Sequence, residues 1–567
     1  MSTTSTPRPW LDSYAEGVPD DIDASEGSLY DLIRESVAQY PDRPALEFFG
    51  RETTYADLGA QIERAAEGLR LLGVQKGDPV AIVLPNCPQH IVAFYAVLRL
   101  GAIVVEHNPL YTPRELRHQF EDHGARVAIA WDKTVETIQG FPADVAVPTV
   151  VSVDVTRAMP FATRAALRLP IAKARESRDA LTTKVRGTVR WEQLVEADPI
   201  DPHIFTPGVD DVALIQYTSG TTGNPKGATL THGNLLANAA QARAWVPQVP
   251  RGTAVVYAVL PMFHAYGLTL CLTFAMSMGA RLVLFPKPDP DLILKVVKKR
   301  PATFLPAVPP IYKRLTQAAD AQGVSLAGIQ IAISGAMALS TDVVEPWEER
   351  TGGYLVEGYG LSECSPVLMA NPVADNRRAG TVGLPLPSTE CRVVDPDHPM
   401  TDVAPGAEGE LIVRGPQVFQ GYWKKPEETE AVFVDDPDGG SPWFRTGDIV
   451  AIDDAGFVRI VDRIKELIIT GGFNVAPTEV EDAILHHPDV EDAAVVGVPD
   501  EHSGEQVVAV VVLREGAAFD PEAIRAFARN GLTPYKVPKR VVQVAELPKS
   551  QIGKVLRRQV RNGLLNG

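Results

Sequence analysis

The chain lacks several features that would assign it to a class at once. It has only four cysteines in 567 residues, Cys87, Cys271, Cys364 and Cys391, and no two of them form a Cys-x-x-Cys pair. This spacing disfavours both a disulfide scaffold and a cysteine zinc site. Positive charge is also scarce, because 54 Lys and Arg face 71 Asp and Glu, for a net charge of −17. A global basic footprint is therefore excluded, and we expect no nucleic-acid partner.

Long apolar runs are missing as well. Residues 1–17 have no basic segment followed by an apolar run, so no signal peptide is predicted. One charge-free stretch, residues 252–280, is interrupted by Pro261, His264, Gly267 and Gly279. A membrane-spanning helix needs about 20 predominantly apolar residues in succession. We therefore interpret this stretch as a buried strand, a turn and a buried helix, and we expect a cytoplasmic protein.

The patterns that are present indicate a multidomain α/β protein. At about 150 residues per domain, 567 residues is a multidomain length. Helix-like and strand-like runs alternate in residues 28–150 and again in residues 211–356. This alternation predicts parallel sheets with helices on both faces. In the first run, residues 29–39 have helical apolar spacing and Ser28 is the predicted N-cap.

The pattern changes after Gly380. Short strand-like runs at residues 391–394, 409–414 and 457–461 are separated by turn residues, which predicts a small β-rich subdomain. The last segment, residues 476–567, is predicted to hold two helices and a strand pair, residues 493–498 and 506–513. We place the boundary so that residues 1–464 form a large N-terminal domain and residues 465–567 form a mobile α+β domain of about 100 residues, a usual domain size.

Residues 157–186 are unlike the rest of the chain. They carry eight Lys or Arg and two acidic residues, a net charge of +6, with apolar residues between the charges. Pro160 and Pro170 limit any helix here. The segment is either a solvated surface insertion or a peripheral contact for an anionic membrane surface or an acidic ligand.

Residues 217–227, YTSGTTGNPKG, have the composition of a phosphate-binding loop. Glycines let backbone N–H groups turn toward an anion, hydroxyl side chains add donors, and Lys226 supplies a positive charge. A Walker A loop is excluded because Pro225 stands where its second glycine belongs. We predict a phosphate loop of another type, with a flexible loop that binds nothing as the alternative.

Together with four further motifs, this loop resembles the adenylate-forming superfamily of acyl-CoA synthetases, aryl-CoA ligases, luciferases and adenylation domains. The motifs are SGAMAL (334–339), EGYGLSE (357–363), FRTGD (444–448) and PKSQIGKVLR (548–557). Within the superfamily, the chain is most similar to bacterial long-chain fatty-acid–CoA ligases. That likeness is carried by NPLYTPRE (108–115), GYGLSECS (358–365), GLPLPSTEC (383–391), GPQVFQGYW (415–423) and IVDR (460–463).

The resemblance implies a two-step ligase of fatty-acid metabolism. A fatty-acid carboxylate attacks the α-phosphorus of ATP to give acyl-AMP and pyrophosphate, and CoA then displaces AMP to give a thioester. ATP and CoA are thus the expected substrates and Mg²⁺ the expected cofactor. A medium-chain or aryl acid–CoA ligase and a fatty acyl-AMP ligase remain alternatives within the same chemistry. A non-catalytic lipid-binding protein is an alternative from another class.

The resemblance also assigns roles in nucleotide binding. Residues 218–226 would hold the β- and γ-phosphates, and Glu363 and the Thr218 hydroxyl would contact Mg²⁺. Tyr359 would stack on adenine, and Asp448, assisted by Arg463, would accept hydrogen bonds from the ribose. The other nucleotide-binding candidates are Ser219, Gly220, Thr221, Thr222, Gly223, Lys226, Gly335, Ala336, Glu357, Gly358, Gly360 and Ser362.

Four residues are expected to serve catalysis or domain movement. Lys554 would bridge the substrate carboxylate and the α-phosphate, and His264 would lie at the acyl site, with Glu363 as the third catalytic candidate. Lys465 matches the residue about which the C-terminal domain turns between the two steps. The chain departs from related aryl-CoA ligases at Ile469, where many of them carry a second lysine.

Overall fold

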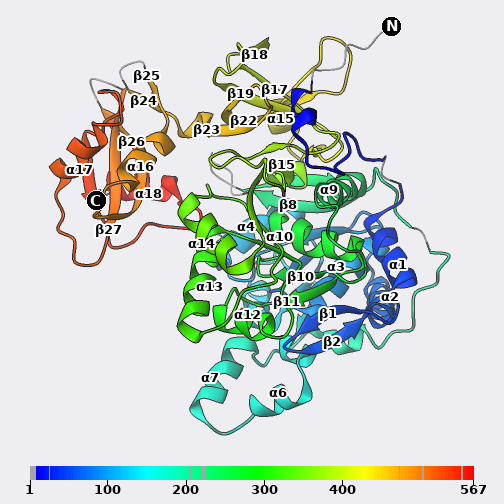
Figure 1. The fold of residues 1–567 in the computed structure, drawn as a ribbon. Coiled ribbons are helices and arrows are strands. Elements are labelled where there is room, and N and C mark those ends of the chain that lie inside the picture. The colour runs from blue at the N-terminus through cyan, green and yellow to red at the C-terminus, as the bar shows by residue number, and fades with distance from the viewer. Residues whose placement is uncertain are drawn as a thin grey trace.

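Two mainly parallel sheets form the large N-terminal part of the protein (Figure 1). The computed structural model describes residues 8–23, 26–204, 206–218, 225–470, 473–500, 504–550 and 553–566. In the nine-stranded sheet the order is β16 (Leu384–Pro385), β15 (Val367–Ala370), β14 (Tyr354–Gly360), β13 (Ile331–Ser334), β12 (Phe304–Ala307), β10 (Val255–Ala258), β11 (Arg281–Leu284), β1 (Pro44–Phe48) and β2 (Arg51–Thr54). In the eight-stranded sheet it is β20 (Gly421–Tyr422), β9 (Lys226–Thr231), β8 (Val212–Thr218), β4 (Ile103–Glu106), β3 (Pro79–Val83), β5 (Val127–Trp131), β6 (Thr149–Val153) and β7 (Val189–Arg190).

Helices cover these sheets, as the alternating pattern predicts. They are α1 (Leu29–Gln39), α2 (Tyr55–Leu71), α3 (Pro88–Arg99), α4 (Pro113–His123), α5 (Asp132–Gln139), α8 (Trp191–Leu194), α9 (His232–Trp245), α12 (Pro290–Val297), α13 (Pro309–Gln322) and α14 (Thr341–Thr351). Ser28 caps α1 through a capping box with Asp31, which confirms the predicted N-terminus. Every residue of α3 from Gln89 to Arg99 is buried. One apolar core cluster takes in α3 together with strands of both sheets.

The charge-free stretch is interior structure. It forms β10, the short helices α10 (Ala265–Gly267) and α11 (Phe274–Ser277), and the π-helical turn η3 (Leu268–Thr273) between them. Nearly all of its residues are buried, so the interpretation as a buried strand, turn and helix is confirmed. Among the helices in the described ranges, none is both long and apolar enough to cross a membrane. The cytoplasmic location stays a prediction.

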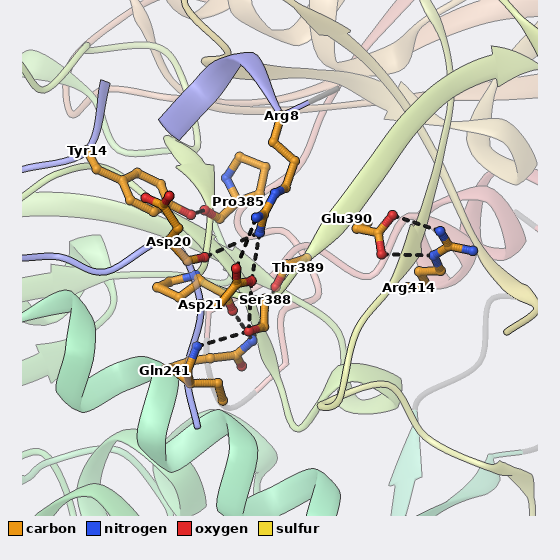
Figure 2. Close-up of polar contacts among 12 residues, drawn as sticks. Arg8, Tyr14, Asp20, Asp21, Gln241, Pro385, Ser388, Thr389, Glu390 and Arg414 are labelled. Atoms are coloured by element: carbon orange, nitrogen blue, oxygen red, sulfur yellow. Dashed lines mark hydrogen bonds and ion pairs between the residues drawn. The ribbon is translucent and has the colours of Figure 1, made fainter. Parts of the chain in front are cut away.

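The predicted β-rich subdomain is a six-stranded antiparallel sheet. Its strands are β17 (Glu390–Asp395), β18 (His398–Asp402), β19 (Gly409–Arg414), β21 (Phe433–Val434), β22 (Trp443–Ile452) and β23 (Val458–Arg463), accompanied by α15 (Pro426–Glu430). The N-terminal segment with η1 (Pro9–Ser13) lies against β16 and the loop that leads from β16 into this subdomain (Figure 2). There the Tyr14 hydroxyl donates to the Pro385 carbonyl at 2.6 Å, and the Ile22 amide donates to Ser388 at 3.0 Å. These contacts tie the start of the chain to residues more than 360 positions away.

The C-terminal part has a sheet and cores of its own. Its strands are β24 (Ile468–Thr470), β25 (Phe473–Val475), β26 (Val490–Asp500), β27 (Gly504–Leu513) and β28 (Arg540–Gln543), and its helices are α16 (Pro477–Leu485), α17 (Pro521–Ala528) and α18 (Arg557–Asn566). Two apolar clusters, separate from the main core, are made of its residues. The predicted strand pair is confirmed, because β26 and β27 pair over residues 493–498 and 506–513. The count for residues 476–567 was too low, because this segment holds a third helix, α18, and the four-residue strand β28, which is too short to show a periodic pattern.

The basic segment forms a projection at one end of the N-terminal domain, the cyan helices in Figure 1. It includes η2 (Val155–Ala158), α6 (Phe161–Ala166) and α7 (Ala172–Leu181), so helix begins directly after Pro160 and two residues after Pro170. Proline is compatible with a helix start, because its missing N–H would have no helical partner there. Phe161 is 83 % exposed, Leu169 51 % and Ile171 54 %.

Candidate active site

A buried ion pair lies close to the start of the C-terminal domain. Asp448 on β22 is 2 % exposed, and its Oδ1 lies 3.0 Å from Nε of Arg463, the last residue of β23. Its other oxygen, Oδ2, accepts a hydrogen bond from the Tyr359 hydroxyl at 2.5 Å. The Asp448 charge is the main cause that raises the pKa of Arg463, whereas burial comes first in raising the pKa of Tyr359. The structure thus brings three predicted nucleotide ligands into one contact group.

A second group joins the predicted metal-binding and phosphate-binding residues. Glu363 lies in η4 (Ser362–Cys364), and its carboxylate accepts a hydrogen bond from the Tyr422 hydroxyl at 2.9 Å. The Lys226 ammonium lies 4.9 Å from the centre of the same tyrosine ring. Burial raises the pKa of Glu363, and the hydrogen bond from Tyr422 opposes this. Tyr422 therefore links the predicted phosphate lysine to the predicted magnesium ligand.

The phosphate loop connects the antiparallel strands β8 and β9. Thr218 and Lys226 are paired across these strands and so stand at the two ends of the loop. Ser219, Gly220, Thr221, Thr222 and Gly223 lie outside the described residues. The geometry therefore fixes where the loop leaves and re-enters the sheet, beside η4, which packs against β8 and β9.

The adenine-side candidates follow two neighbouring parallel strands. Gly335 and Ala336 come directly after β13, whereas Gly358, Tyr359 and Gly360 end β14. A side chain at position 335 is restricted, because an added Cβ would lie 3.1 Å from the Tyr266 ring. Ligands bind at the carboxyl ends of parallel strands in open α/β sheets, and these residues occupy that edge.

Glu357 is the one carboxylate among these adenine-side candidates. Its Oε2 accepts a hydrogen bond from the Leu339 amide at 3.2 Å. Burial raises the pKa of Glu357 to about 8, so its carboxyl group is mostly protonated at neutral pH. A neutral carboxyl adds no charge repulsion toward a bound phosphate.

Lys554 faces this region from the C-terminal domain. The Ser550 amide donates to the Lys554 carbonyl at 2.8 Å. Gly553 precedes it with φ +82°, and an added Cβ there would lie 3.3 Å from Sδ of Met337 in the N-terminal domain. Burial and, next, the charge of Arg463 lower the pKa of Lys554 to about 8. Opposing this, Glu466 and Asp448 favour its charged form.

His264 lies directly before α10. Its Nδ1 accepts a hydrogen bond from the Tyr266 amide at 3.3 Å, which leaves Nε2 as the protonated nitrogen of a neutral ring. Burial and the charge of Lys554 lower the pKa of His264 to about 4. The imidazole is therefore neutral at pH 7 and suited to donate a hydrogen bond, not to act as a cation.

Lys465 lies in the short turn η5 (Ile464–Glu466), where the chain passes from the β-rich sheet to the C-terminal sheet. Burial lowers the pKa of Lys465, and the charge of Lys226 is the second cause. The domain boundary at 464/465 and the hinge role of this lysine stay predictions.

Sequence reasoning missed Tyr422 as a site residue. The segment 415–423 was singled out for its likeness to fatty-acid–CoA ligases, but no role follows from the sequence of the segment alone. Tyr422 acquires one because β20 pairs with β9, which sets its hydroxyl against Glu363 and its ring against Lys226.

The fold has a large N-terminal and a smaller C-terminal domain, and several of the predicted nucleotide-binding residues contact one another. Residues 33–423 match the family model of the AMP-binding enzyme, and residues 479–554 match that of the AMP-binding enzyme C-terminal domain. The chain belongs to the AMP-binding enzyme family.

Relatives with assigned names cover almost the whole chain. A long-chain-fatty-acid–CoA ligase of Bacillus subtilis (strain 168) is 39 % identical, covering 98 % of this chain and 97 % of the relative. Its counterpart of Escherichia coli O157:H7 is 37 % identical, covering 98 % of both chains. Among solved structures, ATP-bound MatB from Rhodopseudomonas palustris superposes with a TM-score of 0.81 at 31 % identity, covering 95 % of this chain and 99 % of MatB.

Proposed function

We propose that the protein is a fatty-acid–CoA ligase that activates a long-chain fatty acid with ATP, forms acyl-AMP and pyrophosphate, and transfers the acyl group to CoA. The observation that carries this proposal is the near-complete coverage by long-chain-fatty-acid–CoA ligases at 37–39 % identity. It is supported by the buried pair of Asp448 and Arg463, with Lys554 facing it from the C-terminal domain.

In the first half-reaction, two anions must approach each other. The Lys554 ammonium is close enough to Arg463, Asp448 and His264 to interact with them electrostatically, and we assign it to contact an α-phosphate and a carboxylate together. A fixed cation in a water-poor site stabilises the charge that develops as the new bond forms. His264 then donates from Nε2 to the acyl carboxylate, which is already ionised at neutral pH.

Asp448 and Arg463 are assigned to the ribose. Oδ2 of the Asp448 carboxylate accepts the Tyr359 hydrogen bond, whereas the buried Oδ1 lies 3.0 Å from Nε of Arg463 without a hydrogen bond from any described residue, so both oxygens can accept from ribose hydroxyls. The Tyr359 ring is assigned to adenine. Its hydroxyl, bonded to Asp448, would fix the ring relative to the sugar.

The residues predicted to contact Mg²⁺ fit an ion that binds together with the nucleotide phosphates. Among the described residues, no group of three or more His, Cys, Asp or Glu forms a cage for a metal. One carboxylate, Glu363, and one hydroxyl, Thr218, are hard oxygen donors of the kind Mg²⁺ takes together with phosphate oxygens. Bound there, the ion would neutralise phosphate charge. Tyr422 would orient the Glu363 carboxylate toward it.

The acyl chain is assigned to the apolar region behind His264, including residues 308–312 and 335–337. A small cavity of about 20 Å³, room for about one water molecule, lies elsewhere in the core. Its lining is wholly apolar and includes Trp245, Leu270, Phe304, Ile333 and Val367. At about 0.8 kcal/mol per buried CH₂, chain length would dominate the affinity for the acid.

Pyrophosphate release with a panel of acids tests this proposal. Acids from acetate to palmitate and oleate, with benzoate and coumarate as aryl acids, are compared with and without CoA. Long-chain preference and acyl-CoA formation are the expected result. Acyl-AMP that accumulates despite CoA would instead favour an acyl-AMP ligase, and ATP turnover independent of any acid would refute the ligase assignment.

We also propose that the 157–186 projection contacts an anionic membrane peripherally. Phe161, Leu169 and Ile171 are exposed at this projection, among eight basic residues. Apolar side chains that enter the interface, together with basic side chains near anionic headgroups, are the two signals that hold a peripheral protein on a bilayer. The test replaces four basic residues by glutamine: Arg164, Arg168, Lys173 and Arg175.

A further inference from the structure

One buried carboxylate crosses the predicted hinge. Asp462 lies on β23, three residues before Lys465, and is 3 % exposed. Its Oδ2 accepts a hydrogen bond of 2.9 Å from the amide of Thr478, the second residue of α16. The acceptor therefore belongs to the sheet before the hinge, and the donor belongs to the domain after it.

Helix α16 has no cap of its own. Its N-cap is Ala476, whose methyl group accepts no hydrogen bond, so the first-turn amides need an acceptor from elsewhere. Asp462 supplies that acceptor for Thr478, and its negative charge also suits the positive end of the helix. By contrast, α17 is capped within the domain, by Asp520 bonded to the amides of Glu522 and Ala523.

Arg557 connects this contact to the catalytic lysine. It lies three residues after Lys554 and donates two hydrogen bonds to Glu481 of α16, at 2.9 and 2.6 Å. It also donates to the Thr478 hydroxyl at 2.9 Å and forms an ion pair with Glu466. One of its Nη atoms lies 4.0 Å from Oδ1 of Asp462. The lysine loop, the start of α16 and Asp462 thus form one continuous network.

We propose that Asp462 is a positioning residue for acyl-AMP formation, which holds the C-terminal domain in the arrangement that presents Lys554 to the Asp448–Arg463 pair. The inference rests on the proposed two-step reaction. Because Lys465 lies between Asp462 and α16, a rotation about Lys465 separates the carboxylate from Thr478. Arg557, Glu481 and Glu466 all follow the hinge and turn together. The Asp462 contact therefore stabilises only one of the two arrangements.

The test compares the two half-reactions in Asp462→Ala. We expect the kcat of acyl-AMP formation, measured without CoA, to fall about tenfold, which corresponds to about 1.4 kcal/mol. The KM for ATP and the rate of thioester formation from supplied acyl-AMP should not fall. Asp462→Asn, which keeps an acceptor oxygen for Thr478, should recover most of the lost rate. Asp520→Ala is the matched control, because it removes a helix cap in the same domain without crossing the hinge.

A second variant tests the idea without touching the Arg463 neighbourhood. Ala476→Ser gives α16 an N-cap of its own. This cap stabilises the helix most in the domain arrangement in which Asp462 no longer contacts Thr478, so it favours that arrangement. The ratio of acyl-AMP formation to thioester formation should therefore fall, by up to about fivefold. Three results for Asp462→Ala would each overturn the proposal. They are an unchanged rate of acyl-AMP formation, an equal loss of both half-reactions, and a raised KM for ATP as the sole effect. Failure of the wild type to form acyl-AMP would instead refute the proposed function.

Discussion

The lowered pKa of Lys554 predicts an unusual pH dependence of acyl-AMP formation. Burial and the Arg463 charge bring this pKa to about 8, whereas a lysine in water titrates near 10.4. The proposed role needs the ammonium, so activity is present below this pKa and is lost as the pH rises through it. With a pKa of about 8, about 90 % of the lysine is charged at pH 7 and about 10 % at pH 9.

The assay is ATP–pyrophosphate exchange with a fatty acid and without CoA, so that the CoA thiol contributes no titration. The profile of kcat/KM reports groups of the free enzyme, which is the state described here. We expect a descending limb near pH 8. Lys554→Ala should lower acyl-AMP formation by about 10²–10³-fold, the usual cost of losing one stabilising group, and leave thioester formation from supplied acyl-AMP largely intact.

Two variants identify the titrating group. Lys554→Arg keeps a charge that does not titrate below about pH 12, so its activity, though reduced by altered geometry, should lose the limb near pH 8. Glu357 also has a pKa of about 8, and Glu357→Gln must therefore retain the limb. A flat wild-type profile between pH 7 and 10, or a limb that vanishes in Glu357→Gln but persists in Lys554→Arg, would refute the reasoning.

Three further predictions concern the ribose ligand, the hinge and the basic projection. Asp448→Ala should weaken ATP use at least about tenfold, since hydrogen bonds to a charged group contribute about 1.5–3 kcal/mol each; an unchanged apparent ATP affinity and rate would contradict the ribose role. Lys465→Pro should keep much of its acyl-AMP formation and lose most of its thioester formation, because proline fixes φ near −65°, whereas Lys465→Ala should be mild in both; a normal acyl-CoA rate in the proline variant would move the hinge elsewhere. The fourfold glutamine variant of the 157–186 projection should bind anionic vesicles less at low salt, with unchanged turnover of soluble substrate, and the membrane contact is wrong if the wild type itself shows no such binding.

Features that depend on neighbours in the chain were predicted well. The Ser28 cap depends on Asp31, three residues on, and the alternation of strands and helices depends on runs of 5–12 residues. The cap and the alternation can both be predicted from the sequence because helices and strands repeat over only a few residues. Features outside this range were missed. The three-residue strands β24 and β25 depend on pairing with each other, and β24 pairs also with β27. The helices of the basic projection begin shortly after the two prolines that were expected to limit any helix there.

The sequence alone determined the family, the order of the motifs and most of the candidate residues, because each motif carries its own chemistry in a few adjacent side chains. Only the tertiary structure decided how those residues act on one another. Tyr359 and Asp448 are 89 positions apart, and Tyr422 reaches Glu363 across 59. The pKa values of Lys554 and His264 are set by burial and by charges from distant segments, and that of Glu357 is set by burial. Desolvation and Coulomb interactions depend on distance in space, which the order of residues along a chain does not specify.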